Sequence, residues 1–182
     1  MSHKKEGDRI SSLDFKITVV YFAILDLFHP TVAKRSRAFG IGEGMTVVDY
    51  GCGLGRYTTH FAALAGFKGK VYGVDIQPLA VEAVRRKAAK QGLPNVEAVL
   101  AQGYDSGLPG NAADVICALD MFSKVQEPTR FLAELRRIIK GDGMLVIDDG
   151  HQPRRVTKEK ILASGCWVIQ EETKDHLRCK PA

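Results

Sequence analysis

The sequence predicts an α/β fold with a mostly parallel sheet and helices on both faces. Strand-like and helix-like patterns alternate from residue 46 onward, which is typical of parallel strands joined by helices. An apolar run that ends in an acid is followed at once by closely spaced glycines and a helix-like segment. Two short strand-like runs close the chain, and they predict a hairpin that makes the sheet mixed.

The first three predicted strands are short, and turn residues separate them from helices. The strands are predicted at residues 46–50, 70–75 and 95–101. The helix after the first strand ends at about Ala65, where Gly66 follows. The helix after the second strand opens at Pro78 and is closed by Gly92, positions that suit proline and glycine.

The second half of the chain repeats this alternation. Further strands are predicted at residues 113–119 and 144–148, and the closing hairpin at residues 167–172 and 176–180. Pro128 opens a helix with an apolar face, and Thr157 is expected to cap a short helix that ends at Gly165. The inward residues of the first of these helices are Phe131, Leu132, Leu135, Ile138 and Ile139.

A glycine loop follows the first strand, with Gly51, Gly53 and Gly55 at alternate positions. Glycine tolerates positive φ and lets a ligand approach the backbone, and the next helix presents free N–H groups. The dinucleotide fingerprint has a third glycine or alanine where this chain has Arg56, which disfavours a nicotinamide dehydrogenase. No G-K-[ST] follows, so the loop is not a P-loop.

An acid ends the second strand. Asp75 stands 20 residues after Gly55, where a carboxylate suits a ribose diol because it can accept from both hydroxyls. The alternative is that Asp75 only caps the helix that opens at Pro78.

Four motifs in this order resemble the class I, Rossmann-like family of S-adenosylmethionine-dependent methyltransferases. They are the glycine loop with Asp75-Ile76, the loop 104–109, the strand 114–120 and the helix-to-strand stretch 135–145. The resemblance covers roughly residues 31–180. It implies a three-layer Rossmann-like fold with a seven-stranded, mostly parallel sheet and an antiparallel strand in the C-terminal hairpin. It also implies S-adenosyl-L-methionine as the cofactor. We expect no bound metal.

The resemblance further implies which residues bind the cofactor. The expected set is Asp49, Gly51, Cys52, Gly53, Gly55, Asp75, Ile76, Tyr104, Asp105 and Leu119. Asp49 would order the loop or hold the amino-acid end through water, and Ile76 would pack on the adenine. Asp105 would accept from the adenine amino group, and the Leu119 carbonyl would lie near the ammonium. Three places depart from the family pattern. Tyr104 replaces a common loop acid, and Ser123-Lys124 stands where relatives carry a histidine. Lys140-Gly141-Asp142-Gly143 replaces the common Lys-Pro-Gly-Gly, which affects only a turn.

The catalytic residues are not identified by the sequence, although Asp120 and His151 are candidate bases after the fourth and fifth strands. His151 is also readily explained as a surface histidine in a polar turn. Asp120 with Asp148-Asp149 resembles the acids that hold magnesium in catechol-type O-methyltransferases. The alternative is that these acids cap loops or shape a cationic pocket.

Composition fits one globular domain of 182 residues with a net charge of +5. The lysines and arginines are spread over predicted helices, as on a solvated face, although a nucleic-acid surface is the alternative. We therefore expect a methyltransferase with a small-molecule acceptor. The alternatives are an RNA methyltransferase, the magnesium-dependent catechol type, or a cofactor-binding protein without turnover.

The chain is expected to comprise an N-terminal helical segment, residues 1–40, and a methyltransferase domain, residues 41–182. Apolar residues at helical spacing over 13–29 predict an amphipathic helix that packs on the core, covers the site as a lid or contacts another subunit. No signal peptide or membrane span is apparent, and no C-x-x-C occurs among the four cysteines. We expect a cytoplasmic monomer or homodimer with free thiols.

Overall fold

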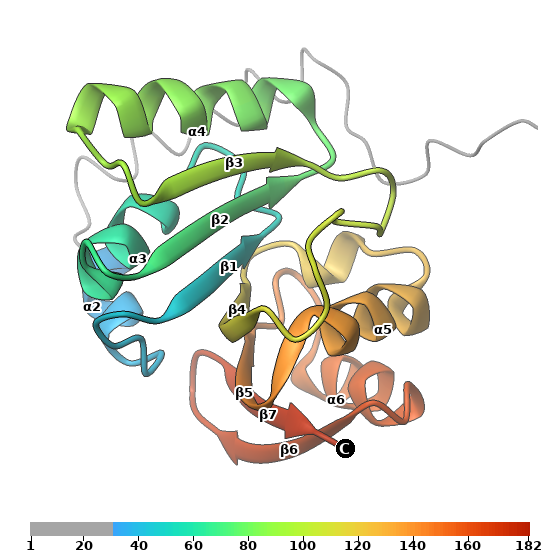
Figure 1. Ribbon diagram of the computed structural model, residues 1–182. Helices are drawn as coiled ribbons and strands as arrows, with labels where there is room; N and C mark the ends of the chain where they lie inside the picture. Colours follow the sequence, from blue (N-terminus) through green and yellow to red (C-terminus); the bar gives the residue numbers. More distant parts are fainter. Residues whose placement is uncertain (1–30) are drawn as a thin grey trace, which may run out of the picture.

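The computed structural model describes residues 31–182, which form a seven-stranded sheet covered by helices (Figure 1). The strand order is β3-β2-β1-β4-β5-β7-β6. Strands β1 to β5 pair in parallel, and β7 runs antiparallel to both of its neighbours, β5 and β6. The strands are β1 (Thr46–Tyr50), β2 (Lys70–Asp75), β3 (Val96–Leu100), β4 (Ala113–Ala118), β5 (Ile139–Ile147), β6 (Trp167–Glu172) and β7 (Leu177–Pro181). The predicted fold class, including the antiparallel hairpin strand, is confirmed.

Helices cover both faces of the sheet (Figure 1). They are α2 (Thr31–Arg37), α3 (Thr58–Ala65), α4 (Pro78–Gln91), α5 (Pro128–Ile138) and α6 (Arg154–Ala163), with the 3₁₀ turn η1 (Phe122–Lys124) after β4. Successive side chains of a strand point to opposite faces. Accordingly Val47 packs with α2 and α3, whereas Val48 packs with α5 and α6. The central strands are therefore apolar at nearly every position, as parallel strands buried on both faces are.

Two elements begin at least three residues earlier than expected, whereas the bounds of the other strands agree with the prediction to within one residue. β5 begins at Ile139 rather than at residue 144, because Ile139 pairs with Ala113 before an irregular stretch restores the register at Met144. Thr157 does not cap α6, which begins at Arg154 after the extended Pro153. Thr157 is instead buried inside the helix, where its hydroxyl accepts a hydrogen bond from Gln152.

The predicted amphipathic helix over residues 13–29 lies outside the described residues, as does most of the expected 1–40 segment. Of that segment the structure describes α2 and the loop after it, which pack on the core through Val32 and Phe39. None of the helices in residues 31–182 has the length and apolar character that a membrane crossing requires.

Candidate functional site

A cavity lies at the carboxyl ends of the central strands. Its wall is formed by the segments that follow β1, β2, β3 and β4, together with η1 and one residue of α5. The chain leaves β1 toward β2 and β3 and returns to β4 on the other side, so the cavity sits where the strand order reverses. Open α/β sheets bind ligands at this position.

The glycine loop forms the floor of this cavity. The backbone N–H groups of Gly51 and Cys52 donate to the carbonyl of Val74, which folds the loop over the end of β2. Gly51 has a φ of +78°, and a Cβ there would lie 2.8 Å from Cγ of Met121. Gly53 has a φ of +51°, and a Cβ there would meet no atom within 4 Å. The loop therefore leaves open space directly over Gly53.

Asp75 lies beside this loop and organises it. One carboxylate oxygen accepts from Gly53 N at 2.9 Å and the other from Gln77 N at 2.8 Å. Burial raises the pKa of Asp75, while these backbone hydrogen bonds oppose that rise. A carboxylate has about four acceptor positions, so Asp75 retains acceptor capacity toward the cavity. The alternative of a helix cap is also realised in part, because Gln77 N precedes α4.

An apolar part of the wall adjoins Asp75. It combines Ile76 after β2, Tyr104 after β3 and Phe131 of α5. The rings of Tyr104 and Phe131 meet edge to face with centroids 6.2 Å apart, and the Tyr104 hydroxyl accepts from Glu127 N. This aromatic and aliphatic surface suits a planar, apolar ring of the ligand.

Two residues of the expected cofactor set do not reach the wall. Asp105 is exposed, and its carboxylate accepts from Gly107 N two residues later. Gly55 is buried behind the loop, where a Cβ would lie 3.1 Å from Val84. The other eight members all line the cavity: Asp49, Gly51, Cys52, Gly53, Asp75, Ile76, Tyr104 and Leu119.

Asp49 at the end of β1 is the most deeply buried acid of the wall. Its carboxylate accepts a hydrogen bond from the Thr58 hydroxyl at 2.5 Å, which ties β1 to the start of α3. Burial raises the pKa of Asp49 to about 7, the Thr58 hydrogen bond opposes the rise, and the charges of Asp75 and Asp120 add to it. This contact holds the helix that follows the glycine loop against β1.

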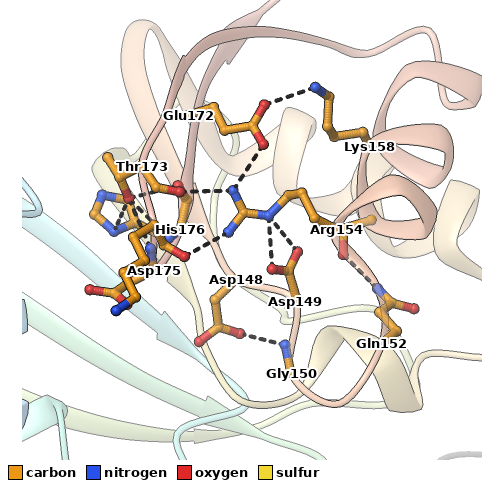
Figure 2. A network of polar contacts seen from close by, with 12 residues as sticks. Asp148, Asp149, Gly150, Gln152, Arg154, Lys158, Glu172, Thr173, Asp175 and His176 are labelled. Atoms are coloured by element: carbon orange, nitrogen blue, oxygen red, sulfur yellow. Dashed lines mark hydrogen bonds and ion pairs between the residues drawn. The ribbon is translucent and has the colours of Figure 1, made fainter.

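The two acids after β5 are held by arginine side chains and backbone N–H groups; Figure 2 shows Asp149 with Arg154 and Asp148 with Gly150. Asp148 accepts from Arg35 through one oxygen and from the N–H groups of Asp120 and Gly150 through the other. Nε of Arg154 donates to both carboxylate oxygens of Asp149, at 2.8 Å each.

This arrangement speaks against the magnesium alternative, because Asp148 and Asp149 already neutralise guanidinium groups. Within residues 31–182 no three histidine, cysteine, aspartate or glutamate side chains are grouped as a metal site would require. In this structure Asp148 and Asp149 instead bind Arg35, Arg154 and the backbone of the loops after β4 and β5.

The two candidate bases differ in their placement. Asp120 lines the cavity and has a left-handed backbone with a φ of +58°. His151 is exposed and contacts the Ser123 hydroxyl only through its backbone N–H, outside the cavity wall. Of the two, only Asp120 faces a ligand bound in the cavity.

Replacing Asp148 with alanine is expected to lower the free energy of unfolding by about 2 kcal/mol, because Arg35 would keep a half-buried, unpaired charge. The Arg35 side chain is 23% exposed and the Asp148 side chain 6% exposed. Glu159→Ala is the matched control, since its pair with Arg155 is 58% and 77% exposed. We expect that control to cost less than about 0.5 kcal/mol in urea unfolding. Equal losses in the two variants would contradict a structural role for the Arg35–Asp148 pair.

Sequence reasoning missed several wall residues, among them Tyr57, Lys124 and Val125. Tyr57 stands directly before α3. Its place between the glycine loop and α3 is a usable signal, because the residue that follows such a loop must border the ligand space.

Comparisons with known proteins place this geometry among methyltransferases. Residues 41–179 match the family described as methyltransferase domain. A solved SAM-dependent methyltransferase from Aquifex aeolicus is 26% identical, with a TM-score of 0.80 over 96% of this chain and 100% of that one.

Two curated relatives extend the comparison. Nocamycin O-methyltransferase of Saccharothrix syringae is 27% identical over 66% of this chain and 43% of that protein. The ubiquinone/menaquinone biosynthesis C-methyltransferase UbiE of Escherichia fergusonii is 25% identical over 84% of this chain and 63% of that protein. The chain thus spans about half the length of these curated relatives.

Proposed function

The chain belongs to the methyltransferase-domain family, a Rossmann-like group of S-adenosylmethionine-dependent enzymes, and we propose that it transfers a methyl group from this cofactor to a small-molecule acceptor. The observation that carries the proposal is the Asp75 carboxylate. It retains acceptor capacity beside the open space over Gly53. A ribose diol with a purine on one side and an amino acid on the other fits this combination.

Each part of the cavity supports a role toward that cofactor. Asp75 would accept from the ribose hydroxyls, and Ile76, Tyr104 and Phe131 would enclose the adenine. Gly53 leaves the space that the ligand needs. The Leu119 carbonyl at the end of β4 would face the ammonium, as the family resemblance implies.

The chemistry asks little of the protein beyond placement. The bound cofactor supplies a methyl group on a sulfonium, which is a good leaving group. The residues of the wall would hold donor and acceptor in line and exclude water, which can contribute roughly 7–11 kcal/mol of barrier lowering. A role for Asp120 as a base stays a prediction, and the exposed position of His151 argues for its reading as a surface residue.

A small-molecule acceptor is supported by these two relatives, whose names refer to nocamycin and to ubiquinone/menaquinone biosynthesis. An RNA acceptor is not favoured. The arginines near His151 are ion-paired, Arg154 with Asp149 and Arg155 with Glu159, so they offer less charge to phosphates. The cytoplasmic location and the choice between monomer and homodimer stay predictions.

Calorimetric binding tests the proposal. S-adenosylmethionine and S-adenosylhomocysteine are expected to bind at micromolar concentrations, whereas a nicotinamide dinucleotide is not. Absence of binding by the first two in a folded sample would refute the proposal.

Gly53→Ala is expected to weaken S-adenosylhomocysteine binding about tenfold, since a methyl group would enter the ligand space. The matched control is Gly92→Ala, because Gly92 has a similar φ of +62° and equally open surroundings at the end of α4. Both variants should lose about 1–2 kcal/mol of stability, the usual cost of alanine in this conformation. Only Gly53→Ala should lose affinity, so equal affinities in the two variants would show that the loop is not the binding floor.

A further inference from the structure

Tyr57 packs into the core cluster beside α2 and α3, whereas the apolar wall residues pack into the cluster beside α5. The Tyr57 ring is fixed by its neighbours. Tyr57 follows the glycine loop, is 6% exposed and lines the cavity. The ring packs against Phe39 and Phe61, with centroids 6.2 and 5.8 Å away. The guanidinium of Arg35 lies 5.7 Å from the ring centroid.

The hydroxyl proton of Tyr57 is not used by Arg35. Nη1 of Arg35 donates to the Tyr57 oxygen at 2.6 Å, and a guanidinium cannot accept in return. Within residues 31–182 no acceptor engages this hydroxyl proton. Burial raises the pKa of Tyr57, Arg35 opposes the rise, and the charges of Asp120 and Asp148 add to it. The phenol therefore stays protonated and has a proton to donate.

Asp120 is linked to this phenol through two other side chains. The Asp120 backbone, which adopts a φ of +58°, donates to one oxygen of Asp148 at 2.8 Å. Arg35 donates to the other oxygen of Asp148 and also to the Tyr57 oxygen. A non-glycine residue held in this conformation at a cavity points to a functional constraint. In the described part of the chain, no hydrogen bond or ion pair engages the Asp120 carboxylate.

We propose that Tyr57 and Asp120 bind the two charged groups of the cofactor's amino-acid end. The Tyr57 hydroxyl donates to the carboxylate, and the Asp120 carboxylate pairs with the ammonium. Arg56, also on the wall, adds positive charge at the same end. A proton donor and an anion close together match a zwitterion, which neither group would do alone. This inference rests on the proposed function, and it makes Arg35 and Asp148 positioning residues for the pair.

Calorimetric binding of three ligands tests the Tyr57 and Asp120 contacts separately. S-adenosylhomocysteine carries both charged groups, its decarboxylated analogue carries only the ammonium, and 5′-methylthioadenosine carries neither. Tyr57→Phe is expected to lower the affinity for S-adenosylhomocysteine about tenfold and to leave the affinities for the other two ligands unchanged. Asp120→Asn is expected to lower the affinities for S-adenosylhomocysteine and its decarboxylated analogue about tenfold, and to leave the affinity for methylthioadenosine unchanged. Asparagine tolerates the left-handed backbone, so this variant should fold.

Tyr104→Phe is the matched control, because it deletes the same hydroxyl at the apolar part of the wall. Any change in affinity that it causes should be the same for all three ligands. If both Tyr57→Phe and Asp120→Asn bind all three ligands as the wild type does, the inference is overturned while the proposed function stands. An equal loss for all three ligands also overturns it, because that pattern indicates a structural role. If the wild-type protein binds none of them, the proposed function fails and this inference fails with it.

Discussion

Replacing Asp75 with alanine is expected to weaken S-adenosylhomocysteine binding by at least about a hundredfold. Two hydrogen bonds from the ribose to a charged acceptor contribute about 1.5–3 kcal/mol each, and each 1.4 kcal/mol corresponds to a factor of ten. Gly53 and Gln77 would also lose the acceptor for their backbone N–H groups, so the loop would be less well held for the ligand. Titration calorimetry measures the loss directly.

The result has meaning only if Asp75→Ala still folds, which thermal unfolding and circular dichroism establish. Asp142→Ala is the matched control, because Asp142 is an exposed acid of β5 outside the cavity wall. It should bind S-adenosylhomocysteine as the wild type does. Wild-type affinity in a folded Asp75→Ala protein would remove the ribose assignment and leave Asp75 only as the partner of Gly53 and Gln77.

The core strands were predictable because local signals agreed. β1, β2 and β4 are apolar runs rich in β-branched residues, and Pro78 and Pro128 mark the first turns of α4 and α5. β5 was placed too late because its first half, through Gly141 and Asp142, has no apolar alternation. Its pairing with β4 comes from tertiary contact, which periodicity does not report.

In the site, too, the residues that a local pattern marks were predicted, and those that only the fold brings together were not. Gly51, Gly53 and Asp75 were found because their spacing along the chain carries the chemistry. The acids after β4 and β5 were found as well, but not their partners. Arg35 is 113 residues from Asp148 in sequence, and nothing local marks the two as a pair. The choice between a metal site and arginine-held loops therefore depended on the fold.

Asp49 is expected to make the protein less stable as the pH rises from about 4 to about 7. Its pKa is 3.8 in ordinary surroundings and about 7 in the folded chain, chiefly because of burial. Within this window the folded state binds the proton and the unfolded state does not, so the free energy of unfolding falls with rising pH. At about 1.4 kcal/mol per pH unit, the whole window corresponds to about 4 kcal/mol.

Asp49→Asn isolates this contribution, because the amide oxygen can still accept from the Thr58 hydroxyl and the side chain no longer titrates. Urea unfolding at several pH values should show the variant gaining stability over the wild type as pH rises, with the difference levelling off above about pH 7. Asp142→Asn, at an exposed position, should track the wild type throughout. Parallel curves for Asp49→Asn and the wild type would mean that Asp49 is ionised in the folded chain. The Thr58 hydrogen bond would then outweigh the cost of burial, and the floor of the cavity would carry a permanent negative charge.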